Sequence, residues 1–201
     1  VTNDQNITNA DPFSSSLGTL ASIGVDKGFS PTAAAPNTPT RLTIRMINTL
    51  ATAFTNLSLN DPLPSGLVPS SPSALATTCS GASVSATSTN VLMSGGSLAA
   101  GSPSSPSICE VSLLVQSTSA GTFTNTIAAG GVSGVNGNGV TVANTDPATA
   151  LFRGLLPVTV GKAFQNASRT LNQANRLTIT LTNPNAVAID SASTSLSTCA
   201  V

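Results

Sequence analysis

Two stretches of the chain carry the same sequence pattern, and every matching position lies 135 residues further on. Residues 25–29, Val-Asp-Lys-Gly-Phe, return at 160–164 as Val-Gly-Lys-Ala-Phe, and the Arg-Leu-Thr-Ile segment at 41–44 returns at 176–179. Asn48 matches Asn183, and the Asp-Pro pair at 11–12 matches the pair at 146–147. Several anchors at one ungapped offset indicate a repeated structural unit.

The offset divides the chain into three parts. Residues 1–23 correspond to the end of a preceding unit, residues 24–157 form one complete unit, and residues 158–201 begin another. The similarity decays near residue 190, since the second unit has no counterpart of the segment at 61–67. We therefore expect one complete domain flanked by two partial ones.

Short runs within the complete unit alternate apolar and polar side chains with a period of two, which is typical of strands with one buried face. The apolar rows are Leu42-Ile44-Met46, Val111-Leu113-Val115 and Phe123 with Ile127. Clusters of Gly, Pro and Ser at 64–72, 95–108 and 128–139 are predicted to be loops. About seven short strands of this kind predict an all-β fold, an immunoglobulin-like antiparallel β-sandwich.

Three polar residues, Lys27, Asp61 and Asn125, lie on rows that should face the core of this sandwich. Each stands two positions from an apolar residue of its row. Lys162 has the same place in the partial unit as Lys27 has in the complete one. A buried lysine is costly unless it is paired or neutral, so these residues are candidates for a functional cluster.

A buried lysine beside an asparagine and a carboxylic acid can form an intramolecular isopeptide bond. Burial lowers the pKa of the amine, which can then attack the amide, and raises the pKa of the acid, which polarises the amide until ammonia leaves. We predict this autocatalytic bond between Lys27 and Asn125, with Asp61 as the acid. Glu110 is the alternative acid, although its alternation with Val111 turns it outward. In the simpler interpretation, Lys27 extends to the edge of the sheet and Asp61 only shapes the Asp-Pro turn.

The three cysteines have no metal-ligand spacing. Cys79 and Cys109 flank the loop-rich middle of the unit, and in a secreted protein they are predicted to form a disulfide rather than two buried thiols. Cys199 is left over for a neighbouring subunit, for chain beyond this sequence, or as a free thiol. Lys162 has no equivalent of Asn125 in its own unit, so its candidate partner is an intersubunit asparagine, Asn6 or Asn9.

The composition argues against several classes of function. Only 7% of the residues are charged and the net charge is zero, so no surface for nucleic acid or an anionic membrane is expected. No apolar run is long enough to insert into a membrane. Histidine is absent and no paired carboxylates can be nominated, so we expect no enzyme and no catalytic triad. We also expect no cofactor and no metal site. A carbohydrate-binding module is the least favoured class, because Phe is the only aromatic residue.

Several motifs resemble a family of tandem repeat domains in large bacterial cell-surface and adhesin-type proteins. The family pattern runs Lys-x-Phe-x-Pro, Leu-Thr-Ile-Thr-Leu-Thr-Asn-Pro-Asn, Asp-x-Leu-Pro-x-Gly-Leu and Thr-Asn-Thr-Ile. Residues 25–31, 61–67 and 121–127 are similar to it, and residues 176–185 fit almost letter for letter. The resemblance implies immunoglobulin-like sandwiches strung in tandem on the cell surface as a stalk, adhesin or fibre. Related surface sandwiches include isopeptide formers.

The partial units lead to a functional hypothesis. A unit that stops after its first strands leaves an unpaired sheet edge. If residues 1–23 of one subunit completed the partial unit of the next, this donor-strand complementation would build an open, head-to-tail filament. The sequence thus predicts a secreted structural subunit of an extracellular bacterial filament, whose partners are copies of itself. The alternative is a stalk fragment of a longer multidomain adhesin, with an unknown glycan or surface target.

Overall fold

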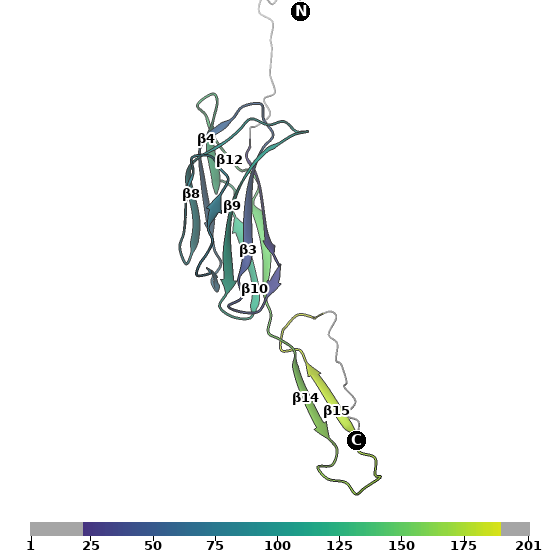
Figure 1. Ribbon diagram of the computed structural model, residues 1–201. Helices are drawn as coiled ribbons and strands as arrows, with labels where there is room; N and C mark the ends of the chain where they lie inside the picture. The colour runs from purple at the N-terminus through teal and green to yellow at the C-terminus, as the bar shows by residue number, and fades with distance from the viewer. Residues whose placement is uncertain (1–21, 190–201) are drawn as a thin grey trace, which may run out of the picture.

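The computed structural model describes residues 22–189, and its fifteen strands form four sheets (Figure 1). The first sheet contains β1 (Gly24–Ser30), β3 (Thr40–Asn48), β9 (Ser107–Ser117) and β5 (Leu67–Pro69), with β6 (Ala76–Thr77) also paired to β9. The second contains β12 (Thr141–Ala143), β11 (Val132–Asn136), β4 (Phe54–Pro62), β8 (Asn90–Leu98) and β7 (Ser83–Ala86). The third contains β10 (Gly121–Ile127), β13 (Ala148–Gly154) and β2 (Ala33–Ala34), and the fourth is the hairpin of β14 (Thr159–Phe164) and β15 (Leu177–Thr182).

The first three sheets enclose one apolar core. β1 lies beside β13, and β10 lies beside β4, so the three-stranded sheet closes one side between the two five-stranded sheets. Nearly all strand pairs are antiparallel, and only β2 and β13 are parallel. The fold is the immunoglobulin-like β-sandwich that the sequence predicts. No helix among residues 22–189 is long and apolar enough to cross a membrane.

The predicted apolar rows are confirmed as the inner faces of β3, β9 and β10. Their side chains are buried, and those of β3 alternate with exposed or half-buried neighbours. Phe152 of β13 packs between Phe29 and Phe123, with ring centroids 5.5 and 6.4 Å away. These aromatic contacts fasten the three-stranded sheet to β1.

The predicted loops are wrong in part, because each of the three segments contains strand residues. β5 lies within 64–72, β8 continues into 95–108, and β11 lies within the glycine-rich segment 128–139. Gly134 fits the last case: a Cβ at this position would lie 2.9 Å from Cδ2 of Leu57, so a larger residue would require the Leu57 side chain to shift where β11 packs on β4. Thirteen strands up to Gly154, rather than about seven, result from such short additional pairings.

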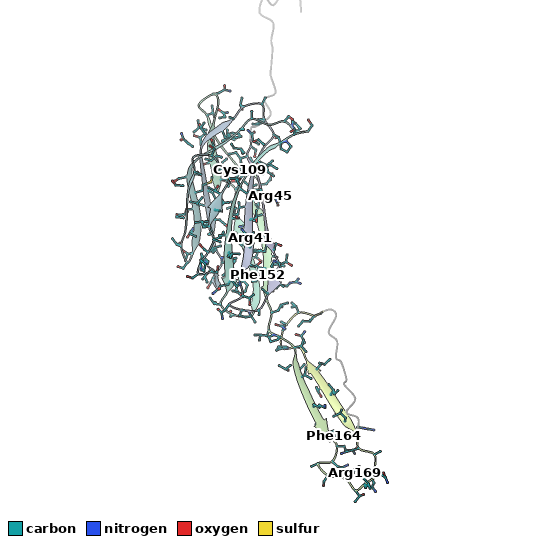
Figure 2. The ribbon with its side chains drawn as sticks, in the orientation of Figure 1. Arg41, Arg45, Cys109, Phe152, Phe164 and Arg169 are labelled. Atoms are coloured by element: carbon teal, nitrogen blue, oxygen red, sulfur yellow. A yellow bond between two sulfur atoms is a disulfide. The ribbon has the colours of Figure 1, made fainter. Side chains whose placement is uncertain are left out.

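The described chain enters and leaves the sandwich at opposite ends of β13. Ser22 Oγ lies 3.2 Å from Oγ1 of Thr145, shortly before β13 begins, whereas Leu155 follows directly after β13 ends. The hairpin β14–β15 projects from the exit end (Figure 1). Phe164 on this hairpin is far from Phe152 of the sandwich core (Figure 2).

Candidate cross-linking site

Lys27, Asp61 and Asn125 come together in the core from three different sheets. Lys27 is in the middle of β1, Asp61 is near the end of β4, and Asn125 is in the middle of β10. Each points inward because its strand alternates around it, and Asp61 and Asn125 have no exposed surface. The prediction that these three residues lie on core-facing rows is confirmed. The interpretation that Lys27 extends to the sheet edge is wrong, because its side chain is fully enclosed.

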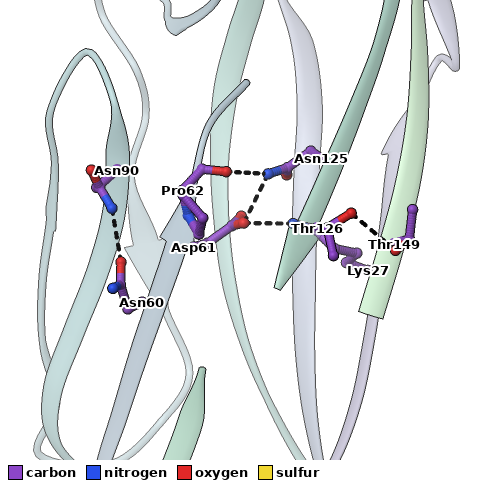
Figure 3. A network of polar contacts seen from close by, with 8 residues as sticks. All are labelled: Lys27, Asn60, Asp61, Pro62, Asn90, Asn125, Thr126 and Thr149. Atoms are coloured by element: carbon purple, nitrogen blue, oxygen red, sulfur yellow. Dashed lines mark hydrogen bonds and ion pairs between the residues drawn. The ribbon is translucent and has the colours of Figure 1, made fainter. Parts of the chain in front are cut away.

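One oxygen atom joins the three side chains (Figure 3). Asp61 Oδ1 accepts a hydrogen bond from Lys27 Nζ at 2.7 Å and another from Asn125 Nδ2 at 2.8 Å. Asn125 Nδ2 also donates to the backbone carbonyl of Pro62 at 2.9 Å. Since both bonds from Nδ2 go to acceptors, they fix the orientation of the Asn125 amide.

Two buried oxygens at this site have no hydrogen-bond partner: Oδ2 of Asp61 and Oδ1 of Asn125. They belong to two groups that already share a hydrogen bond on their other side. A proton on Asp61 Oδ2 would turn this buried oxygen into a donor and would remove the charge from the carboxyl group. An unpaired, buried Oδ2 is therefore compatible with a protonated Asp61.

Burial shifts the pKa values of both titratable groups toward their neutral forms. Desolvation lowers the pKa of Lys27 from its ordinary value, and the attraction and hydrogen bond of Asp61 oppose this shift only in part. Desolvation raises the pKa of Asp61, against the opposing effects of Lys27 and Asn125. A neutral amine and a protonated carboxylic acid are the two reactants that amide exchange requires.

The site has the groups for one reaction among its own side chains. In this reaction the neutral Nζ of Lys27 would attack the side-chain carbonyl carbon of Asn125, forming a C–N bond while the C–Nδ2 bond breaks. Asp61 would give its proton to the departing nitrogen and regain one from the amine, so ammonia would leave and Asp61 would be unchanged. The product would be an amide that joins β1 to β10.

Pro62 is the part of the site that the sequence pattern does not indicate. Its carbonyl oxygen accepts a hydrogen bond from the Asn125 amide. A backbone acceptor of this kind cannot be recognised from the residue type. Two further polar pairs lie on either side of the site, Asn60 with Asn90 and Thr126 with Thr149 (Figure 3). Both pairs are exposed, so they belong to the surface rather than to the cluster.

Glu110 points outward, as its alternation with Val111 predicts. Its Oε1 accepts a hydrogen bond from Nε of Arg45 at 2.6 Å on the exposed face of the first sheet.

We expect Glu110→Gln to show the same mass loss relative to its own sequence as the parent chain, and the same unfolding midpoint. The reason is that exposed ion pairs contribute little to stability. Intact-mass spectrometry and thermal unfolding test this. Loss of a cross-link in this variant would instead identify Glu110 as the acid.

The structure joins Cys79 and Cys109 by a disulfide. Thr78 N donates to the Glu110 carbonyl on β9, and Ser80 forms a bridge to Ser97 on β8, so the disulfide lies where the chain passes from the first sheet to the second. Asn6, Asn9 and Cys199 lie outside the described residues. Lys162 is exposed on β14.

The four phenylalanines of the sandwich, Phe29, Phe54, Phe123 and Phe152, are buried. They therefore offer no flat ring for stacking on a sugar. Phe164 on the hairpin is 61% exposed.

The complete sandwich coincides with a known sequence family. The family described as "Domain of unknown function (DUF7933)" matches residues 24–152. The chain belongs to this family. The matched range begins at β1 and ends within β13, so it includes Lys27, Asp61 and Asn125. No curated protein matches the chain.

Two solved structures are similar to this member of the family at low identity. The pilus backbone RrgB from Streptococcus pneumoniae is 10% identical with a TM-score of 0.41, over 59% of this chain and 32% of that one. The chain thus spans about a third of the pilus backbone. A non-cellulosomal cohesin from the archaeon Archaeoglobus fulgidus is 11% identical with a TM-score of 0.42, over 67% of this chain and 91% of that one.

Proposed function

We propose that this chain is a structural subunit of an extracellular fibre, built from immunoglobulin-like units placed end to end and locked internally by the Lys27–Asn125 amide. The observation that carries the proposal is the hairpin β14–β15, which starts the pattern of the sandwich again at its far end. Lys162 pairs with Ile179 in the hairpin as Lys27 pairs with Ile44 in the sandwich. A unit that begins again where the previous one ends is typical of a repeat array.

The connection between the two units is short and held in place. Only residues 155–158 separate β13 from β14. The side chain of Asn185 accepts a hydrogen bond from Leu156 N at 2.7 Å and donates to Leu156 O at 2.8 Å. These bonds tie the base of the hairpin to the connection, which supports a stiff, extended series of units rather than a flexible chain of domains.

The buried cluster supports a structural role rather than turnover of an external substrate. Asp61 and Asn125 have no exposed surface, so a substrate from solution cannot reach them without opening the core. Their reaction would consume the Asn125 amide once and leave a permanent link between strands. We therefore infer self-modification and no enzymatic activity.

Intact mass tests the cross-link directly. We expect the purified chain to be lighter than its sequence by about 17 Da, the mass of one ammonia, in addition to the loss of hydrogen at the disulfide. Peptide mapping should find Lys27 joined to Asn125. The control is Lys27→Met, which keeps the unbranched apolar part of the side chain and removes the amine. An unmodified mass contradicts the bond, and a loss of about 18 Da mapped to Lys27 and Asp61 would show that the carboxyl group reacts instead.

Electron microscopy of the native protein, released without denaturant, tests the fibre. Uniform filaments with a regular axial repeat would support head-to-tail assembly of separate subunits. Chains of beads in one polypeptide would favour the stalk of a multidomain adhesin. Isolated globular particles in preparations of the complete native protein would contradict both.

The rate of cross-linking should depend on pH with two limbs. The reactive form, with a neutral Lys27 amine and a protonated Asp61, carries as many protons as the Lys27–Asp61 ion pair. The ratio of these two forms therefore does not depend on pH, and the rate is flat between the two macroscopic pKa values. The rate falls at lower pH because the pair takes up a second proton and the Lys27 amine is then protonated. It falls at higher pH because Asp61 loses its proton. Since the pKa of Asp61 is raised and that of Lys27 is lowered, both limbs should lie between the ordinary values of 3.8 and 10.5.

This profile can be measured on chain recovered unfolded from inclusion bodies and refolded at each pH, with intact mass followed over time. Lys27→Arg is the control, since a guanidinium stays protonated throughout. A rate that keeps rising into alkaline solution would show that the proton on Asp61 is not needed.

A further inference from the structure

The hairpin β14–β15 reproduces β1–β3 residue by residue. All six pairs of the hairpin, from Thr159↔Thr182 to Phe164↔Leu177, correspond to pairs of β1 and β3 at the constant offset. The following turn is also repeated. Asn48 accepts from Leu50 N and donates to Thr52 O at 2.9 and 2.8 Å, whereas Asn183 accepts from Asn185 N and donates to Val187 O at 3.0 and 2.8 Å.

One face of the hairpin is an apolar surface with a lysine at its centre. On this face Lys162 is flanked by Val160 and Phe164 along β14, and the residues opposite on β15 are Leu177, Ile179 and Leu181. The equivalent face of β1–β3 is buried against the rest of the sandwich, except for Val25, which is half-buried. Here Val160 is 64% and Phe164 61% exposed.

The contacts of β1–β3 show what is missing around the hairpin. β3 pairs with β9 along its whole length, but β15 has no second neighbour in the part of the chain that the structure describes. Asn48 Nδ2 also donates to Ala99 O just after β8, whereas within residues 22–189 Asn183 Nδ2 donates only to Val187 O. Lys27 meets Asp61, whereas Lys162 forms no ion pair with a described residue.

We propose that the Lys162 face of the hairpin is the docking surface for the body of a second sandwich of this kind, a set of strands equivalent to β4–β13. Its β9 equivalent pairs with the open edge of β15, and its buried acid and asparagine meet Lys162. The Lys162 amine then attacks the asparagine carbonyl carbon, the C–Nδ2 bond breaks and ammonia leaves, with the acid returning unchanged. This inference rests on the proposed function and names the partner of the second unit.

A completed second unit tests the inference. The chain is kept through Ala188, and residues 189–201 are replaced by a copy of residues 54–154, so that the Asn183 turn runs into a new β4. We expect a loss of about 34 Da, two molecules of ammonia, against about 17 Da for the parent chain. Hydrogen exchange of residues 159–164 and 177–182 should slow to the level of β1 and β3.

Lys162→Ala in the same chimera is the matched control. It should lose about 17 Da only, while the slow exchange of β15 persists, because docking does not need the amide. Fast exchange of the hairpin in the chimera overturns the inference even when the first unit keeps its cross-link. If neither lysine reacts, the amide of the proposed function is contradicted. Hydrogen exchange of β14 and β15 then decides by itself whether the Lys162 face docks a sandwich body.

Discussion

Asp61→Ala is expected to prevent the mass loss and to destabilise the sandwich strongly. Removing one partner of a buried Lys–Asp pair typically costs about 3–5 kcal/mol, because the remaining group stays buried without a partner. In this variant Lys27 is the remaining group, enclosed in the core beside Asn125. Intact mass measures the first effect, and guanidinium unfolding at neutral pH measures the second.

Lys27→Met separates the missing cross-link from the buried charge, because both variants lack the amide but only one leaves a lysine. The pKa of Lys27 is lowered by burial, so Asp61→Ala should gain stability as pH rises toward 10.5, where the amine is neutral in both folded and unfolded chains. The pKa of Asp61 is raised, so Lys27→Met should be most stable below 3.8 and should lose stability as pH rises through the folded pKa. Equal stability of the two variants across this range would contradict a shared buried site.

Removal of the disulfide is expected to destabilise the sandwich about as much as Asp61→Ala does. The bond between Cys79 and Cys109 closes a loop with a sequence separation of 30. The loop-entropy model gives a stabilisation of roughly 3–4 kcal/mol for such a loop. We expect Cys79→Ala/Cys109→Ala to lower the free energy of unfolding by about this amount, measured in guanidinium chloride.

The control for the disulfide is the parent chain unfolded with and without dithiothreitol. Reduction should reproduce the effect of the double variant, and it should have no effect on the double variant itself. The mass loss assigned to Lys27 and Asn125 should persist in both, since the disulfide lies outside that cluster. A difference below about 1 kcal/mol would show that the strand pairings already restrict this loop.

The sequence predicts the fold and the three clustered side chains because both follow from alternation. Lys27, Asp61 and Asn125 stand at regular two-residue steps from apolar residues of their own strands, although in β4 this alternation is interrupted between Phe54 and Leu57. Their mutual contact depends on which sheets face each other, which a single strand does not encode. The resemblance of the motifs to those of bacterial cell-surface repeat domains gave the expectation that the three residues meet.

Other features could not be derived from local sequence. β11 runs through a glycine-rich segment that has the composition of a loop, and at Gly134 it approaches Leu57 of β4 so closely that a Cβ would lie 2.9 Å from Cδ2 of Leu57. The Pro62 carbonyl accepts a hydrogen bond from the Asn125 amide, but backbone acceptors leave no pattern in a sequence. The division of the chain at residues 23 and 157 stays a prediction.

The opposite positions of Ser22 and Leu155 have a mechanical consequence. In the proposed fibre, tension would enter the sandwich through β1, the strand of Lys27, and leave it after β13, which is paired with the strand of Asn125. With the amide in place, the pulling force would pass from β1 directly to β10, and residues 28–124 would carry none of it. Each bypassed residue would otherwise add about 3.5 Å of contour length on unfolding. The disulfide lies within this sheltered stretch, so a reducing environment would soften the isolated domain without lengthening the fibre under tension.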